Sequence, residues 1–150
     1  MTTTDTTPLL EVRDLCVTFA SDAGPVRAVL SLAYEMRRGE VLGIVGESGS
    51  GKTVLSRTIM GLTPRRGTQL SGSVRFEGKE ILGLEPKDMR GVWGREMAMI
   101  FQDPMTSLNP VFTVEKQMGE VLKLRFGMAP DAARKRSAVM LATVGIADPE

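Results

Sequence analysis

The chain has 150 residues, of which 42% are hydrophobic and 25% charged, and its formal net charge is +1. This length suffices for one domain of ordinary size, and the composition is typical of a globular protein. The near-neutral charge demands no acidic partner, so we expect no nucleic-acid partner. The sequence holds no histidine, which excludes any mechanism in which this chain supplies a histidine base, metal ligand or switch.

The N-terminal residues are polar and read MTTTDTTP. We interpret residues 1–8 as a disordered N-terminus and expect no secretory signal there. No window of the sequence approaches the roughly 18 apolar residues that a membrane-spanning helix needs. The single cysteine, Cys16, cannot form an internal disulfide. Its strand-like surroundings indicate a buried thiol, which suits a reducing compartment.

Alternating apolar residues predict three strands with one covered face. The first spans residues 9–19, and its inward side chains form two short runs, Leu10/Val12 and Leu15/Val17/Phe19. The second places four side chains on one half-buried face, namely Leu30, Leu32, Tyr34 and Met36. The third lies within residues 71–81 and is antiparallel, with a glycine turn after it.

Two further segments are apolar at nearly every position, which is typical of strands covered on both faces. They are VLGIV at 41–45 and MAMIF at 97–101. If strand 41–45 lacks its parallel neighbours, it exposes unpaired backbone groups and apolar surface, so we expect the isolated chain to aggregate.

Helices are predicted at four places. A helix is predicted over residues 52–60, because Leu55, Ile59 and the following Leu62 have helical spacing and Gly61 can stop the helix. Pro86 can open a short helix that ends near Gly91. A loop at 103–110 precedes two amphipathic helices. The first begins after Thr113 and places on one face Val114, Met118, Val121, Leu122 and Phe126. The second begins at Pro130, ends at Gly145 and turns inward Ala133, Ala138, Leu141 and Val144.

Residues 46–53, GESGSGKT, fit the pattern G-x-x-x-x-G-K-[ST] of a phosphate-binding loop. Glycines let successive main-chain N–H groups converge on a phosphate, and the following helix adds its positive end. The ammonium of Lys52 is expected to reach the β- and γ-phosphates, and the hydroxyl of Thr53 to ligate Mg²⁺. The alternative interpretation is a glycine-rich turn with a solvent-exposed lysine.

The stretch MAMIFQD at 97–103 superficially resembles the acidic strand of phosphate-loop enzymes, in which an apolar run ends in an aspartate that supports Mg²⁺. Here Gln102 comes first, and Asp103 is followed at once by Pro104. A residue before proline is pushed to an extended conformation, so we interpret Asp103 as the start of a loop.

GESGSGKT together with MIFQDPMTSLNP at 99–110 resembles the ATP-binding subunits of ABC transporters, especially the dipeptide and oligopeptide importers. The two motifs are specific for the ABC class, but they distinguish peptide importers less clearly from nickel importers. The resemblance extends from about Leu9 to the end of the chain. It implies an α/β fold, with a P-loop NTPase (RecA-like) core, an antiparallel β subdomain and the start of an α-helical subdomain, incomplete in this chain. We therefore assign 9–112 to the N-terminal part of the nucleotide-binding domain and 113–150 to the beginning of the helical subdomain.

The resemblance also assigns roles to residues. Phe19 matches the aromatic that stacks on adenine, unless it is simply an inward strand side chain. Gln102 matches a glutamine that ligates Mg²⁺ or contacts the attacking water; without the family it is a polar residue that ends a strand. Lys52 and Gln102 are the candidate catalytic residues, and Thr53 and Gln102 the metal ligands. The candidate ATP-binding loop comprises Gly46, Glu47, Ser48, Gly49, Ser50, Gly51, Lys52 and Thr53.

The function that the resemblance implies is that of an ABC-type ATPase subunit, a hydrolase that couples ATP hydrolysis to peptide import. Such a subunit binds ATP and Mg²⁺, dimerises with a second ATP-binding subunit, and docks on membrane-embedded permease subunits at the cytoplasmic face of the membrane. Other subunits select the cargo.

The acidic strand, signature loop and switch histidine of the family are not found in this sequence. We expect a part of a longer subunit that by itself binds but does not hydrolyse ATP. The alternatives are a truncated, non-catalytic chain that docks on partners and a non-transport ABC ATPase acting on DNA. A nucleotide kinase leaves MIFQDPMTSLNP unexplained.

Overall fold

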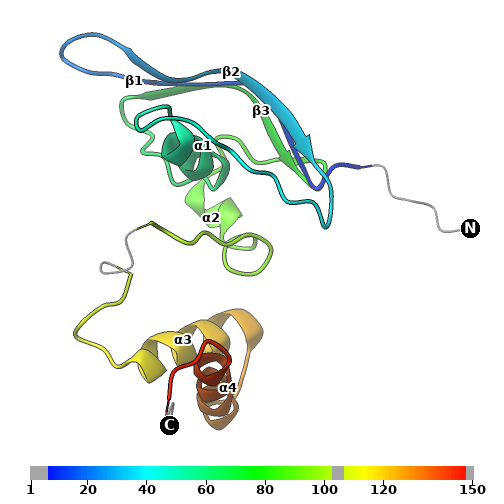
Figure 1. The fold of residues 1–150 in the computed structure, drawn as a ribbon, viewed down its shortest axis with the longest axis vertical. Helices are drawn as coiled ribbons and strands as arrows, with labels where there is room; N and C mark the ends of the chain where they lie inside the picture. Colours follow the sequence, from blue (N-terminus) through cyan, green and yellow to red (C-terminus); the bar gives the residue numbers. More distant parts are fainter. Residues whose placement is uncertain (1–6, 103–106, 148–150) are drawn as a thin grey trace, which may run out of the picture. The chain divides into compact units, whose positions relative to one another are not determined.

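The computed structural model describes residues 7–102 and 107–147 (Figure 1). The chain divides into two compact units, Met1–Met97 and Ala98–Glu150. The elements are β1 (Leu10–Phe19), β2 (Val26–Met36), α1 (Lys52–Ile59), β3 (Thr68–Phe76), β4 (Lys79–Glu80), α2 (Pro86–Met89), α3 (Val114–Phe126) and α4 (Pro130–Thr143). Among the described residues, no helix is long and apolar enough to cross a membrane.

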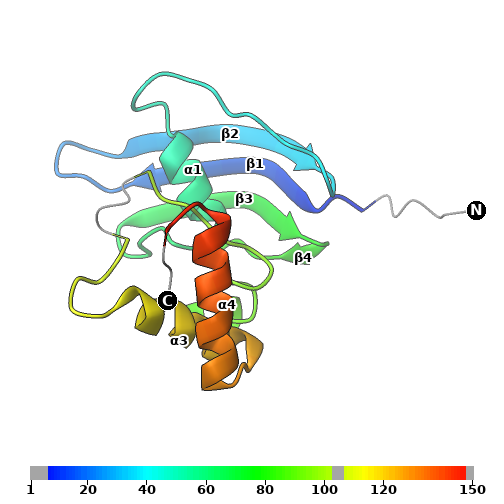
Figure 2. The same ribbon diagram turned by 60° about the horizontal axis from the view of Figure 1, so that its bottom comes forward.

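The first unit is built on an antiparallel sheet with the strand order β2-β1-β3-β4, and α1 lies against one face of it (Figures 1 and 2). The sheet confirms the three strands expected from alternating residues. The third begins earlier than expected, at Thr68, and ends before a turn at Glu77 and Gly78. The short helix α2 confirms the one expected from Pro86.

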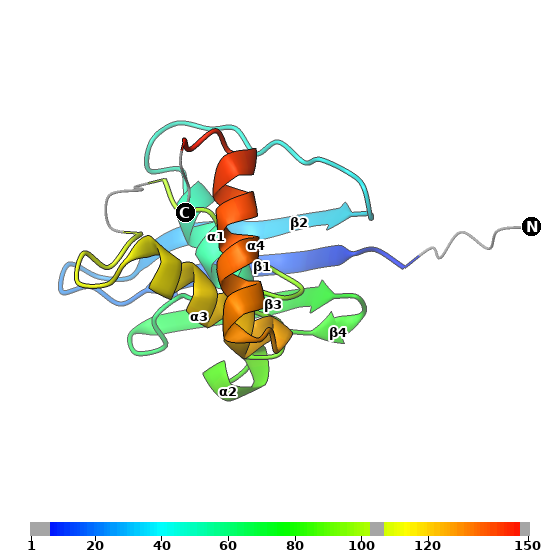
Figure 3. The same cartoon turned by 90° about the horizontal axis from the view of Figure 1, so that it is seen from below.

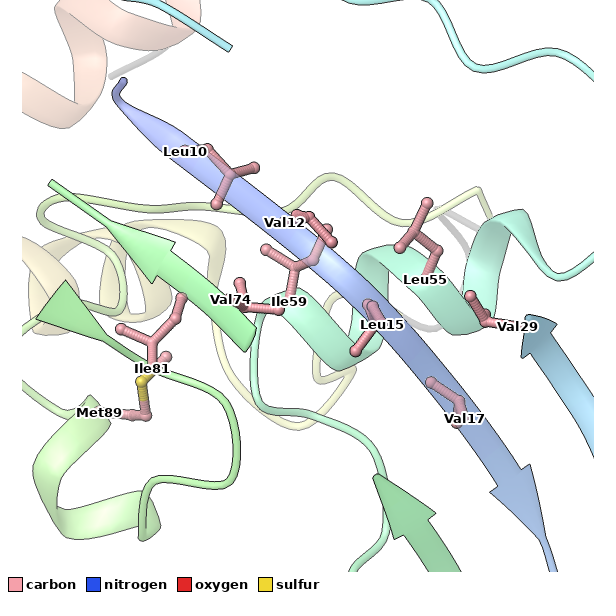
Figure 4. Close-up of a cluster of buried hydrophobic side chains, with 10 residues drawn as sticks. All are labelled: Leu10, Val12, Leu15, Val17, Val29, Leu55, Ile59, Val74, Ile81 and Met89. Carbon is pink, nitrogen blue, oxygen red and sulfur yellow. The ribbon is translucent and has the colours of Figure 1, made fainter. Parts of the chain in front are cut away.

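The core of this unit lies where the sheet meets α1 and α2 (Figure 4). Side chains of β1 and α1 face one another, and Ile81 and Met89 extend the cluster toward α2. The indole Nε1–H of half-buried Trp93 donates to the carbonyl of Met60 at 2.7 Å and so fastens the end of α1. The buried members of the core are Leu10, Val12, Leu15, Val17, Val29, Leu55, Ile59, Val74, Ile81 and Met89.

A β-bulge explains why both apolar runs of β1 face inward. Between the pairs Arg13–Ser73 and Cys16–Ser71, β1 contains one residue more than β3. Asp14 adopts a φ of 46° there. On the opposite strand, a side chain at Gly72 would approach the carbonyl oxygens of Arg13 and Asp14 to 2.5 Å. The bulge shifts the alternation by one residue, so the residues on both sides of it reach the core.

A second bulge corrects one expectation for β2. Leu32, Tyr34 and Met36 pack against the core as expected, but Leu30 is 65% exposed and Val29 takes the inward position. Ser31, with a φ of 44°, lies between these two groups. Because a bulge turns the residues before it to the other face, simple alternation placed Leu30 wrongly.

Cys16 is a free cysteine, but it is half-buried rather than buried. Its Sγ accepts a hydrogen bond from the N–H of Ser31, with a donor–acceptor distance of 3.2 Å. Cys16 is therefore only partly shielded from solvent beside the β2 bulge.

The two expected apolar strands at 41–45 and 97–101 are not formed. Residues 41–45 belong to no sheet of the described chain, and Val41 and Val45 are 98% and 94% exposed. The second segment contributes only an isolated bridge between Trp93 and Met97. A strand buried on both faces needs hydrogen-bonded neighbours and covering layers, and the described residues supply neither to these segments.

The carboxylate of Glu80, a residue of β4, accepts hydrogen bonds from β3 and from the segment after β4. It accepts hydrogen bonds from the N–H groups of Val74 and Leu82, at 2.9 and 3.0 Å, and from the hydroxyl of Ser73. Desolvation raises the pKa of Glu80, but these hydrogen bonds and the nearby Arg75 outweigh it and hold the pKa below its ordinary value.

We expect Glu80 to stabilise the fold above its ordinary pKa of 4.5, and this contribution to be lost as the pH falls through the lowered pKa. Urea unfolding should show Glu80→Gln less stable at pH 7 by up to about 1 kcal/mol, since the side chain is nearly half exposed. The difference should shrink below pH 4.5. Glu120→Gln, at an exposed site in α3, is the control. A difference that does not change with pH would contradict this role.

The second unit contains a hairpin of α3 and α4, which pack against each other (Figure 3). The hydroxyl of Thr113 accepts from the N–H of Lys116 at 3.2 Å and caps α3, and Pro130 occupies the first turn of α4. Both helices confirm the expected ones, and Gly145 follows the end of α4 with a φ of 84°.

The inward faces expected for these helices are only partly correct. The buried residues of the two helices are few and mostly small, namely Gly119, Leu122, Ala133 and Ser137. Met118, Ala138 and Leu141 were expected to be inward and are half-buried, so the expectation is met only in part for them. Several residues expected to be inward are exposed, namely Val114, Val121, Phe126 and Val144.

Candidate functional site

The loop at 46–53 leads directly into α1. The N–H of Ser50 donates to the carbonyl of Glu47 at 3.2 Å, which forms a turn inside the loop. Gly51 precedes α1 with a φ of 90°, and no side chain caps the helix. The first N–H groups of a helix lack acceptors within the helix, so this end of α1 favours an anion.

The ammonium of Lys52 turns back into the loop. Its Nζ donates to the carbonyls of Gly46 and Glu47 at 2.7 and 2.6 Å, and to the Ser50 hydroxyl at 3.2 Å. The loop is closed tightly around these groups, because a side chain at Gly46 would approach Ser50 Oγ to 2.7 Å. A flexible cation and the uncapped start of a helix thus lie in one short loop.

This arrangement fits a nucleoside triphosphate. Phosphate oxygens accept hydrogen bonds from main-chain N–H groups and from an ammonium, and both kinds of donor are present here. Lys52 can exchange its two carbonyl acceptors for phosphate oxygens by turning its flexible side chain. The Thr53 side chain is exposed in the first turn of α1 and makes no hydrogen bond among the described residues, so its hydroxyl is open to a metal ion.

The other predicted site residues occupy different positions. Phe19 is the last residue of β1, pairs with Val26 and Thr68, and is half-buried at the edge of the core. This placement agrees with an inward strand side chain and leaves part of the ring accessible. Gln102 is exposed and belongs to the second unit. The expectation for Asp103 lies outside the described residues.

One contact of the loop could not be predicted from the sequence. The main chain of β2 at Ala28 lies beside Gly51, so closely that a side chain at position 51 would overlap the Ala28 carbonyl oxygen. This contact depends on how β2 pairs with β1, which residue spacing does not reveal.

A loop with the phosphate-binding motif that leads into a helix beside a sheet is typical of a P-loop protein of the α/β class. The profile of the family described as ABC transporter matches residues 29–150. The chain belongs to the ABC transporter family, as the resemblance of its motifs indicated.

Curated relatives cover nearly all of this chain. The oligopeptide transport ATP-binding protein OppD of Bacillus subtilis is 48% identical over 145 residues, which are 96% of this chain and 40% of that protein. The dipeptide transport ATP-binding protein DppD of Haemophilus influenzae is 49% identical over 142 residues, 95% of this chain and 43% of that protein. The chain thus spans less than half the length of these relatives.

Solved structures share the fold. A dimeric ATP-binding cassette in a post-hydrolysis state, bound to ADP and Pi, matches with a TM-score of 0.76 at 19% identity, over 93% of this chain and 58% of that one. The cbiO1 protein of Clostridium perfringens, part of an ABC transporter complex, matches with a TM-score of 0.64 at 25% identity, over 93% of this chain and 51% of that one. These matches confirm the expected P-loop NTPase fold, present here in part.

Proposed function

We propose that the chain is the ATP-binding part of an ABC importer subunit and that its loop at 46–53 holds the triphosphate of Mg-ATP. The observation that carries this proposal is the ammonium of Lys52, held by three acceptors of the loop beside the uncapped start of α1. Binding of a triphosphate replaces these internal acceptors by oxygens of higher charge, which form stronger hydrogen bonds.

Each residue of the proposed site has its own role in binding Mg-ATP. The main-chain N–H groups from Gly46 to Thr53 surround the phosphates, Lys52 neutralises their charge, and the Thr53 hydroxyl holds Mg²⁺. The ring of Phe19 stacks on adenine with its accessible part. Gln102, in the segment that leads into α3, is the candidate that the resemblance gives for contacting Mg²⁺ or the attacking water. The metal ion supplies charge neutralisation between the phosphates.

The relatives support a proposal for the cargo class and the partners. Two proteins that are 48% and 49% identical to this chain over nearly all of its length are named for oligopeptide and dipeptide transport, which supports a peptide importer. A subunit of this kind works as a dimer with a second ATP-binding subunit, on permease subunits at the cytoplasmic face of the membrane. The dimeric cassette among the structural matches supports the dimer. We infer further that residues 1–150 alone bind ATP without hydrolysing it.

Replacing Lys52 by alanine should weaken the binding of Mg-ATP by roughly 10- to 100-fold, because charge-assisted hydrogen bonds to the phosphates contribute about 1.5–3 kcal/mol. Fluorescence titration with an N-methylanthraniloyl derivative of ATP and MgCl₂ measures the affinity. Lys79→Ala, at an exposed lysine in β4 of the same unit, is the matched control and should bind as the wild type does.

Circular dichroism at the titration temperature checks that the wild type, Lys52→Ala and Lys79→Ala are folded. Equal affinity of the wild type and Lys52→Ala would remove the proposed role of the loop. Failure of the folded wild type to bind would favour a non-catalytic chain that only docks on partners.

A further inference from the structure

Strand β2 contains an extra residue close to the nucleotide loop. Val17 pairs with Val29, whereas the next residue of β1, Thr18, pairs with Arg27. Ala28 is therefore the additional residue of a β-bulge. Bulges bend a strand locally and re-aim its groups, and they are frequent beside functional sites.

This bulge brings the main chain of β2 against Gly51. A side chain added at Gly51 would overlap the carbonyl oxygen of Ala28 and would lie 3.3 Å from its carbonyl carbon. The nearest side-chain atom, Cγ2 of Val29, would be 3.7 Å away. Gly51 is the residue at which the loop ends and the helix begins, since its carbonyl accepts the N–H of Leu55 at 2.8 Å.

Gly49 provides an internal comparison. It has nearly the same backbone conformation, with a φ of 83° against 90° for Gly51, but a side chain added there would meet no atom within 4 Å. Both positions disfavour a side chain through their backbone conformation. Only Gly51 is also confined by a neighbouring strand, so the two glycines separate the effect of φ from the effect of the contact.

We propose that the bulge at Ala28 is a positioning element of the nucleotide site. Its main chain confines Gly51, and through Gly51 it fixes the direction in which the first N–H groups of α1 point. The bulge touches neither phosphate nor metal in this role; it acts through the loop. The inference rests on the proposed function, because it concerns the same phosphate site.

The test compares deletions of two bulge residues in β2, Ala28 and Ser31. Each deletion removes one extra residue from the same strand, but only Ala28 lies against Gly51. Deletion of Ala28 should weaken binding of the fluorescent Mg-ATP derivative at least about tenfold, whereas deletion of Ser31 should change it less than about threefold. Equal losses of affinity in the two folded deletion variants would overturn the proposal and leave the bulge a purely structural feature.

The two glycines keep the proposal testable if a deletion variant does not fold. Without nucleotide, Gly51→Ala should melt about 4 °C or more below Gly49→Ala, because it adds a steric overlap to a similar backbone penalty. Equal melting temperatures would overturn the inference. If the wild type binds ATP and Lys52→Ala does not, the proposed function stands whatever the bulge variants do; if the wild type does not bind, both fall.

Discussion

Incubated with Mg-ATP, the 150-residue chain should release phosphate at no more than about a thousandth of the rate of a full-length peptide-importer ATP-binding protein. Phosphoryl transfer depends on several groups that position the nucleophile and stabilise charge together, and losing them as a set costs orders of magnitude in rate. This sequence offers Lys52 and Gln102 as candidate catalytic residues and has no histidine. We therefore expect it to retain binding while turnover becomes negligible.

A malachite-green assay measures this release of phosphate over several hours at saturating Mg-ATP. The Lys52→Ala variant, purified in the same way, gives the background from contaminating ATPases. The wild-type chain should not exceed that background. Turnover within about tenfold of the full-length protein would show that residues 1–150 already contain a working site.

The wild-type chain alone should self-associate, and replacing both Val41 and Val45 by lysine should largely restore a monomer. These two valines are almost fully exposed, on a segment whose backbone belongs to no sheet of the described chain. Extended apolar segments with unpaired backbone groups pair with other copies. Because the valines make so little contact, their replacement should change the free energy of unfolding by no more than about 0.5 kcal/mol.

Size-exclusion chromatography with light scattering, over a range of protein concentrations, measures the association. The matched control is the double variant Val121→Lys and Val139→Lys, which adds the same charge at exposed valines of α3 and α4. This control should still associate, since segment 41–45 is unchanged. A wild type that stays monomeric over this range of concentrations would contradict the expectation.

Local patterns predicted the elements that depend on local interactions. Alternation predicted the two inward runs of β1, and the bulge at Asp14 accounts for the change of phase between them. The helix after the loop was predicted from its spacing and its glycine stop, and α1 ends one residue earlier, at Ile59. The candidate phosphate site could also be predicted from the sequence, because its residues are contiguous from Gly46 to Thr53.

Features that depend on distant partners could not be read in this way. Segment 41–45 has the composition of a buried strand, but composition does not supply the neighbours that would make it one. Likewise, an amphipathic pattern predicts an apolar face on α3 without saying how much of it a neighbour covers, and Val121 remains exposed. The contact of Ala28 with Gly51 arises from strand register, which no spacing of residue types encodes.

The hydrogen bond from Trp93 to Met60 has a practical consequence. Trp93 is the one tryptophan of the sequence, so the intrinsic emission of the chain at long wavelength comes from a single half-buried indole. That indole is fastened to the end of α1 remote from Lys52. The protein thus carries its own optical reporter on the helix that begins at the phosphate loop, and no label has to be attached to follow that helix.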